Sequence, residues 1–247
     1  MTYNPKILLL QIREEKEVLE SELEGFSKHS GVSRENFEVL DVFNDRHFDI
    51  ERLDSFDALF VGGSSSASVL EIEKYPFVPR CIELLKYASK TKTPVFASCF
   101  GFQLAVLAFG GEIIQSPENQ FEMGIVDIAL TLEAKTDQIF RNCPNPFRAV
   151  SVHREKAINC PPDCILLAHT QECVHSFKHR HSPFWAFQFH PEVDEKELCY
   201  RLALYIEKYG SQDQLEEVIR KKAETPDSNN LLKNFVNFLT RQSSTSL

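Results

Sequence analysis

The stretch from Thr93 to Gly111 constrains the fold of this 247-residue chain more than any other part of its sequence. It opens with a short apolar run, Pro94 to Ser98, which is typical of a fully buried strand. A second apolar run, Gly101 to Phe109, predicts a buried helix, and the two glycines after it predict the helix end. Cys99 therefore falls where a strand must turn sharply into a helix.

Cys99 has two interpretations at this position. A sharp turn from strand to helix presents one side chain at the top of an α/β sheet, as in a nucleophile elbow. The adjacent helix N-terminus favours a thiolate, which would make Cys99 a nucleophile. The alternative is a buried structural thiol, because free cysteines are among the most buried residues. This stretch alone leaves both interpretations open.

Strands and helices alternate along the chain up to Gly111. Strands are expected at Lys6 to Ile12, Phe37 to Phe43 and Asp57 to Val61, and helices at Glu14 to His29 and Pro79 to Ser89. This alternation predicts a parallel sheet with right-handed crossovers. The third strand runs into a Gly62-Gly63-Ser64 turn at its carboxyl end, which is the edge where such sheets bind ligands. Cys99 is expected at the same edge.

The pattern changes after Gly111. Short strands are expected at Met123 to Leu132, Phe147 to His153, Cys164 to His169, Glu172 to Phe177 and Phe184 to His190. This β-rich insertion is expected to form one wall of a site. Helices are expected at Glu195 to Tyr209, Gln212 to Lys222 and Pro226 to Thr240. We therefore expect an α/β domain over residues 1–210, with an open, mostly parallel sheet flanked by helices, and a helical C-terminal extension over residues 211–247 packed on the same domain.

Composition excludes several classes of function. The formal net charge of −9 argues against nucleic acid or an anionic membrane surface as a partner. The sequence has no apolar run of the roughly 20 residues that span a bilayer, and its beginning lacks the pattern of a signal peptide. Seven cysteines at irregular spacings fit reduced thiols better than a disulfide framework. We expect a cytoplasmic protein.

A second motif follows in the Phe187 to Glu192 segment, F-Q-F-H-P-E. An apolar strand ends in His190, and Glu192 follows two residues later, past a proline. A nucleophilic thiol needs a base within hydrogen-bond reach, and that base needs an acid to orient it. Cys99, His190 and Glu192 can form this set if their two strands end at the same edge of the sheet.

With both motifs considered together, the sequence resembles the class I (triad) glutamine amidotransferases, in particular the stand-alone domain of the GMP-synthase-like type. Five motifs in the family's order carry this resemblance: Gly62-Gly63-Ser64, Cys99-Phe100-Gly101-Phe102-Gln103, Glu122-Met123-Gly124, Ser151-Val152-His153 and Gln188 to Glu192. The resemblance covers residues 6–209 and implies a flavodoxin-like sheet.

The resemblance also implies a mechanism. Cys99 would attack the side-chain carboxamide of glutamine, and His190, oriented by Glu192, would transfer protons. The reaction would pass through a γ-glutamyl thioester on Cys99. Backbone N–H groups near Gly63 and of Phe100 would hold the oxyanion that develops on the way to it. The resemblance places four residues in the glutamine pocket: Ser65, Gln103, Val152 and Arg154. It implies neither a metal nor another cofactor.

The fate of the ammonia stays open at this level. The domain could supply ammonia to a partner such as an ATP-dependent synthetase, or it could act alone as a hydrolase of γ-glutamyl peptides or amides. Arg154 stands where many family members carry glycine, beside the expected pocket. A non-catalytic interaction protein on the same fold is the third alternative, and the intact set of Cys99, His190 and Glu192 argues against it.

A further group of candidate metal ligands lies in one short segment. Cys173, His175, His179 and His181 combine a thiol with three imidazoles. Their spacing matches no common zinc signature, so we expect an exposed hairpin with polar side chains and no metal.

Overall fold

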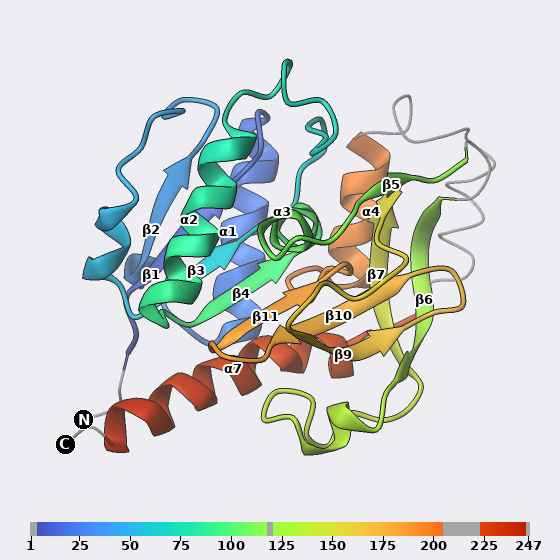
Figure 1. Ribbon diagram of the computed structural model, residues 1–247. Coiled ribbons are helices and arrows are strands. Elements are labelled where there is room, and N and C mark those ends of the chain that lie inside the picture. The colour runs from blue at the N-terminus through green and yellow to red at the C-terminus, as the bar shows by residue number, and fades with distance from the viewer. Residues whose placement is uncertain (1–3, 118–120, 205–222, 246–247) are drawn as a thin grey trace.

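The computed structural model describes residues 4–117, 121–204 and 223–245. Its centre is a nine-stranded sheet with the strand order β2-β1-β3-β4-β11-β10-β9-β6-β7 (Figure 1). The first five strands of this order are parallel to one another: β2 (Phe37–Asp41), β1 (Ile7–Gln11), β3 (Ala58–Val61), β4 (Val95–Ser98) and β11 (Phe184–Phe187). The predicted parallel core is confirmed.

The β-rich insertion extends the same sheet with antiparallel strands. These are β10 (Val174–His179), β9 (Cys164–His169), β6 (Glu122–Leu130) and β7 (Phe147–His153). Two short strands, β5 (Ile114–Gln115) and β8 (Glu155–Lys156), pair separately and were not predicted. The sheet is therefore open and mixed, with a parallel half and an antiparallel half.

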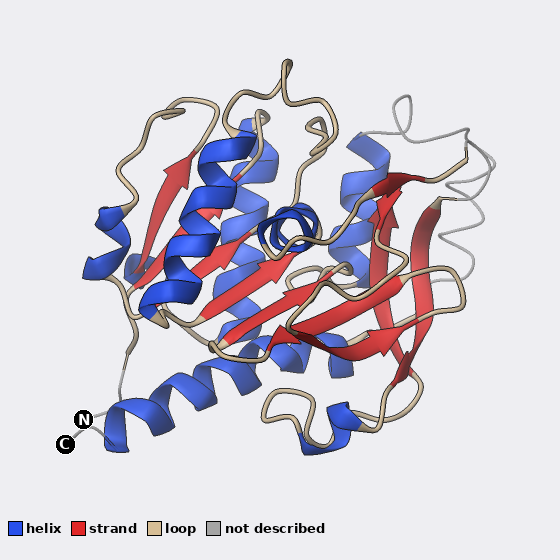
Figure 2. Cartoon of the chain, viewed as in Figure 1, coloured by secondary structure: helices blue, strands red, loops and turns tan. Residues whose placement is uncertain are grey.

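Helices cover both faces of the parallel half. They are α1 (Lys16–Ser30), α2 (Val78–Thr91), α3 (Phe100–Ala108) and α7 (Pro226–Thr245), and Figure 2 shows α2 and α3 in front of the sheet. A fifth helix, α4 (Glu195–Leu204), packs on β6 and β7 of the antiparallel half. Three short 3-10 helices, η1 (Arg34–Asn36), η2 (Glu51–Ser55) and η3 (Glu133–Thr136), lie in the connections. Among the described helices, none has the length and apolarity needed to cross a membrane.

An apolar layer on each face of the parallel half explains why its strands are continuous apolar runs in the sequence. Leu8 and Leu10 of β1 face one layer, which they share with α2 and α3. Ile7 and Leu9 face the other layer, which they share with α1 and α7. Because successive side chains of a strand point to opposite faces, a strand covered on both faces must be apolar throughout.

The C-terminal helix α7 belongs to the second layer. The Phe235 ring lies 5.5 Å from that of Phe60 and 5.4 Å from that of Phe96, measured between ring centroids. The helix begins at Pro226, as predicted, but it continues to Thr245 instead of ending at Thr240. The expected helix over 212–222 and the last turn of the helix expected over 195–209 lie outside the described residues.

The expectation of an exposed hairpin around Cys173 was wrong. Cys173 is 5% exposed, and His175, on β10, is fully buried. The reason is topological, because β10 pairs with β11 on one side and with β9 on the other. His179 lies apart from them at the end of β10, where its ring stacks on that of Phe109.

Candidate active site

Cys99 occupies the turn between β4 and α3, as the sequence predicts. Its backbone has φ 50° and ψ −100°, in a region that residues other than glycine rarely adopt. Such a conformation costs about 1–3 kcal/mol and persists where the surroundings impose it. Here the Cys99 N–H donates to the Phe187 carbonyl at 2.7 Å, and the Gly101 N–H donates to the Gly62 carbonyl at 3.2 Å.

His190 and Glu192 reach the same edge of the sheet because β11 lies parallel to β4. Phe187, the last residue of β11, pairs with Ser98, the last residue of β4. His190 Nδ1 lies 2.7 Å from Glu192 Oε1, and the Glu192 side chain is fully buried. The His190 N–H donates to the Val150 carbonyl of β7 at 2.8 Å, which ties this loop to the insertion.

The charges of this group reinforce one another. Burial alone would lower the pKa of His190, but the charges and hydrogen bonds of Cys99 and Glu192 outweigh it and raise this pKa to about 10. Burial alone would raise the pKa of Glu192, but the charge of His190 outweighs it and lowers this pKa. The arrangement therefore holds a protonated imidazole between a thiol and a carboxylate.

Two elements that the motifs did not indicate hold the His190–Glu192 loop. Asn229 of α7 donates its Nδ2–H groups to the carbonyls of Pro191 at 2.8 Å and Val193 at 3.1 Å. Gly25 of α1 packs against the same loop, since a Cβ placed there would lie 2.3 Å from the Glu192 carbonyl oxygen. No residue larger than glycine fits between α1 and this loop.

The glycine turn after β3 lies directly beside the thiol. A Cβ on Gly63 would lie 2.9 Å from His190 Cε1 and 3.4 Å from Cys99 Cβ. In this structure the Gly63 N–H donates to Glu22 Oε1 at 3.1 Å. The N–H assigned from the sequence to the oxyanion hole is thus close to Cys99 but bonded to a carboxylate.

Glu22 belongs to a buried ion pair that the sequence motifs did not reveal. Its Oε1 lies 3.0 Å from Arg13 Nη2, and Arg13 Nη1 donates to Ser65 Oγ at 2.8 Å. A signal was available, because Glu22 stands four residues from both Val18 and Phe26, on the apolar stripe of α1. A carboxylate on that stripe is buried and needs a cation.

A cleft of about 260 Å³ opens at the thiol. Its lining includes the elbow and every residue that the resemblance places in the glutamine pocket: Ser65, Cys99, Phe100, Gln103, Val152 and Arg154. Cys99 Sγ lies 3.8 Å from the Val152 carbonyl oxygen, and Gln103 Nε2 donates to the Glu155 carbonyl at 3.1 Å. Gln103 is therefore buried and faces β8.

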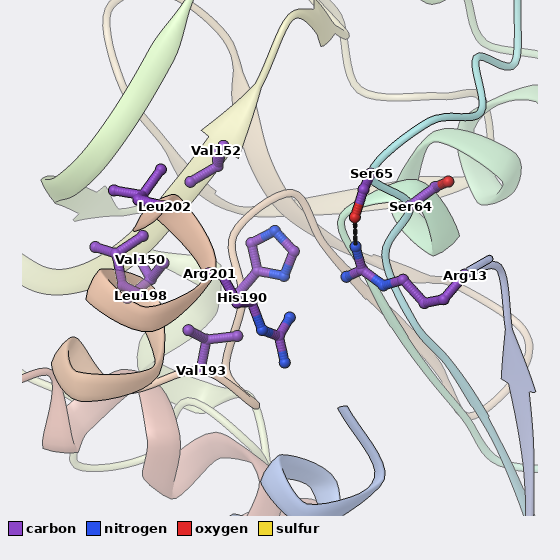
Figure 3. A pocket seen from close by; sticks show the side chains of 10 residues that line it. All are labelled: Arg13, Ser64, Ser65, Val150, Val152, His190, Val193, Leu198, Arg201 and Leu202. Atoms are coloured by element: carbon purple, nitrogen blue, oxygen red, sulfur yellow. Dashed lines mark hydrogen bonds between the residues drawn. The ribbon is translucent and has the colours of Figure 1, made fainter. Parts of the chain in front are cut away.

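A smaller cavity of about 40 Å³ lies beside His190 (Figure 3). It shares Ser64, Ser65 and Val152 with the cleft. Figure 3 shows His190 between the Arg13–Ser65 pair on one side and apolar side chains of β7 and α4 on the other.

The family model of the class-I glutamine amidotransferases matches residues 27–201 of this chain. The chain therefore belongs to the class-I glutamine amidotransferase family. It is 32% identical over 128 residues to the A subunit of a glutamine-hydrolyzing GMP synthase from Methanocaldococcus jannaschii, a match that covers 51% of this chain and 62% of the relative. It is 30% identical over 149 residues to a gamma-glutamyl-L-1-hydroxyisopropylamide hydrolase from a Pseudomonas species, over 57% of this chain and 48% of the relative. These matches span less than two thirds of either relative's length.

Solved structures agree on the fold. A glutamine amidotransferase from Thermotoga maritima superposes with a TM-score of 0.74 at 19% identity, over 96% of this chain and 99% of that structure. A GMP synthase A-subunit protein from Thermoplasma acidophilum gives a TM-score of 0.69 at 18% identity, over 100% of this chain and 99% of that structure.

Proposed function

We propose that this chain hydrolyses the side-chain amide of glutamine with Cys99 as nucleophile, His190 as acid and base, and Glu192 as its orienting carboxylate. One observation carries the proposal: the cleft, the strained Cys99 turn and the 2.7 Å His190–Glu192 contact meet at one edge of the sheet. A thiol, an imidazole and a carboxylate in this arrangement are the groups that acyl transfer through a thioester needs.

The proposed reaction has two halves. The Cys99 thiolate attacks the amide carbon, and the C–N bond breaks as His190 gives its proton to the departing ammonia. His190 then accepts a proton from the water that attacks the γ-glutamyl thioester, which releases glutamate and restores the thiolate. Glu192 keeps the His190 ring oriented and stabilises its charged form in both halves.

The oxyanion would be held by backbone N–H groups. The Phe100 N–H stands at the start of α3, where N–H groups have no partner within the helix. The Gly63 N–H donates to Glu22 in this structure, so we propose that the turn releases it to the oxyanion when substrate binds.

We further propose that the ammonia passes to a partner synthetase. Support comes from the similarity to GMP synthase A subunits, which are named as one part of a glutamine-hydrolyzing synthase. Under this proposal the isolated chain hydrolyses glutamine slowly, because full activity requires the partner synthetase to be bound.

A stand-alone hydrolase of γ-glutamyl amides is the second candidate. The similarity to the Pseudomonas amide hydrolase favours it. Arg154 adds a second reason, because this exposed residue lines the cleft where a leaving group larger than ammonia would sit.

Glutamate release from glutamine and from a panel of γ-glutamyl alkylamides and peptides distinguishes the two candidates. We expect glutamine to be a substrate and the panel to be inert. Faster turnover of an alkylamide or peptide than of glutamine would establish the second candidate instead. A chain that releases glutamate from none of them, and whose Cys99 is not labelled by a diazoketone analogue of glutamine, would contradict both.

A further inference from the structure

A compact group of four potential metal ligands lies beside the cleft, within the insertion. It consists of Glu122, His153, Cys173 and His175, whose carboxylate oxygen, two imidazole nitrogens and sulfur all lie within 4.8 Å of one another. We call it the EHCH cluster. Cys173 and His175 come from the cysteine- and histidine-rich segment noted in the sequence. Glu122 and His153 come from other parts of the chain.

The sheet brings these side chains together. Glu122 opens β6 and pairs in register with His153, the last residue of β7. Cys173 directly precedes β10, and His175 is its second residue. Three of the four residues lie on different strands of one sheet and Cys173 adjoins one of them, so backbone pairing brings them together and no short sequence signature reveals them.

Three of the six distances between the ligand atoms are close to those around a tetrahedral ion. Glu122 Oε2 lies 3.1 Å from His153 Nε2 and 3.1 Å from His175 Nε2, and Cys173 Sγ lies 3.4 Å from His175 Nε2. Zinc bonds of about 2.0–2.3 Å in a tetrahedron place neighbouring ligand atoms about 3.3–3.6 Å apart.

The surroundings favour a cation at this point. The side chains of His153 and His175 are 2% and 0% exposed, and that of Glu122 is 15% exposed. Within the described residues, the ion pairs of Glu122 are those with the two imidazoles, so this carboxylate has no Lys or Arg partner among them. A divalent ion with one thiolate and one carboxylate makes a neutral buried site.

Two hydroxyl groups hold the carboxylate in place. Ser151 Oγ donates to Glu122 Oε2 at 2.9 Å, and Thr170 Oγ1 donates to Glu122 Oε1 at 3.3 Å. Hydrogen bonds of this kind orient ligands in metal sites.

We propose that the EHCH cluster is a structural zinc site. The mixture of one sulfur, two imidazole nitrogens and one carboxylate oxygen is a donor set that zinc accepts, and four protein ligands leave no position for substrate. The ion would fix the end of β7, where Val152, next to His153, turns its carbonyl toward Cys99 Sγ at 3.8 Å. The competing interpretation is a hydrogen-bonded network in which both imidazoles donate to Glu122.

The metal content of the purified 247-residue chain, produced with added zinc and handled without chelators, tests the proposal. We expect about one zinc per chain, and less than about a tenth of that in the Cys173→Ser/His175→Gln double variant. Cys160→Ser is the matched control and keeps its zinc, because Cys160 lies outside the cluster.

Titration with Co²⁺ covers the case in which the double variant does not fold. The wild-type chain, stripped of metal and shown by circular dichroism to be folded, should give the intense visible bands of tetrahedral Co²⁺ and a thiolate charge-transfer band. Cys173→Ser should lose the charge-transfer band. Absence of both zinc and the cobalt bands in the folded wild-type chain would overturn the proposal, as would unchanged zinc in a folded double variant. Neither readout depends on amide hydrolysis, so this proposal and the proposed function can fail separately.

Discussion

At the scale of single residues, the site depends on groups that would be unfavourable elsewhere. Cys99 has a positive φ, Glu192 is a fully buried carboxylate, and Arg13 and Glu22 form a buried ion pair beside the glycine turn. Each is tolerated because a specific partner stands within hydrogen-bond distance. Removal of one partner should therefore have a large and local effect.

Replacement of Glu22 by alanine tests the buried ion pair. The change leaves the Arg13 guanidinium, 4% exposed, without its carboxylate, so we expect the free energy of unfolding to fall by about 3–5 kcal/mol. Glu24→Ala on the same helix removes only an exposed pair with Arg34 and should change it by less than about 1 kcal/mol. Urea denaturation of both variants measures the difference. Equal changes in the free energy of unfolding would show that the buried Arg13–Glu22 pair stabilises the fold no more than the exposed Arg34–Glu24 pair does.

The protonation of His190 depends on Cys99. Burial lowers the pKa of His190, while Cys99 and Glu192 raise it to about 10, so Cys99→Ala should lower this pKa. Because the folded pKa exceeds the ordinary value of about 6.5, His190 stabilises the fold fully below that pH, and the contribution is lost as pH rises through about 10. NMR titration of the imidazole in both proteins measures the shift. An unchanged pKa in Cys99→Ala would mean that the thiol does not interact with the ring.

At the scale of elements, the His190–Glu192 loop depends on the C-terminal helix α7. Asn229 of α7 is 8% exposed and bonds to two carbonyls of the loop that carries His190 and Glu192. The C-terminal helix thereby contributes to the geometry of the site as well as to the core.

Asn229→Ala should therefore reduce turnover. Two loop carbonyls lose their donor, and a shift of the loop by a fraction of an ångström is expected to lower kcat by about 10- to 100-fold with little change in KM. Asn230→Ala, an exposed neighbour on the same helix, is the matched control. Steady-state kinetics with glutamine measures both constants. A variant that loses thermal stability but keeps its kcat would assign Asn229 a purely structural role.

Sequence patterns predicted the elements whose signals are local. The β4–Cys99–α3 turn and the buried strands of the parallel half follow from apolar runs and glycines, and the structure has them within one or two residues of the expected bounds at most positions. The burial of His175 could not be predicted, because it depends on β10 being placed between two other strands. The role of Glu22 was missed because its partner Arg13 lies outside the helix, and no short motif links the two residues.

At the scale of the whole molecule, one sheet carries both the site and the stability of the chain. The aromatic layer between the sheet and α7 includes Phe60, Phe96, Trp185 and Phe235. Two strands of this layer end just before Cys99 and just before the His190 loop, so the packing of the core sets the relative position of these two residues.

Phe235→Ala tests this layer. The fully buried ring contacts four other aromatic rings, and its loss should lower the free energy of unfolding by about 3–5 kcal/mol. Leu132→Ala, whose side chain is 75% exposed, should change it by less than about 0.5 kcal/mol. Thermal and urea unfolding give both values. A small effect of Phe235→Ala would mean that α7 is not an integral part of the core.

The most direct test of the central proposal is the mass of the intact chain after an acid quench during turnover of glutamine. We predict a γ-glutamyl adduct on Cys99 in the wild-type chain. In Cys99→Ala, which should fold normally by circular dichroism because a small residue suits the turn, we predict neither adduct nor glutamate release. Glutamate release at the wild-type rate by folded Cys99→Ala would contradict the account, since the nucleophile would then have to be another group.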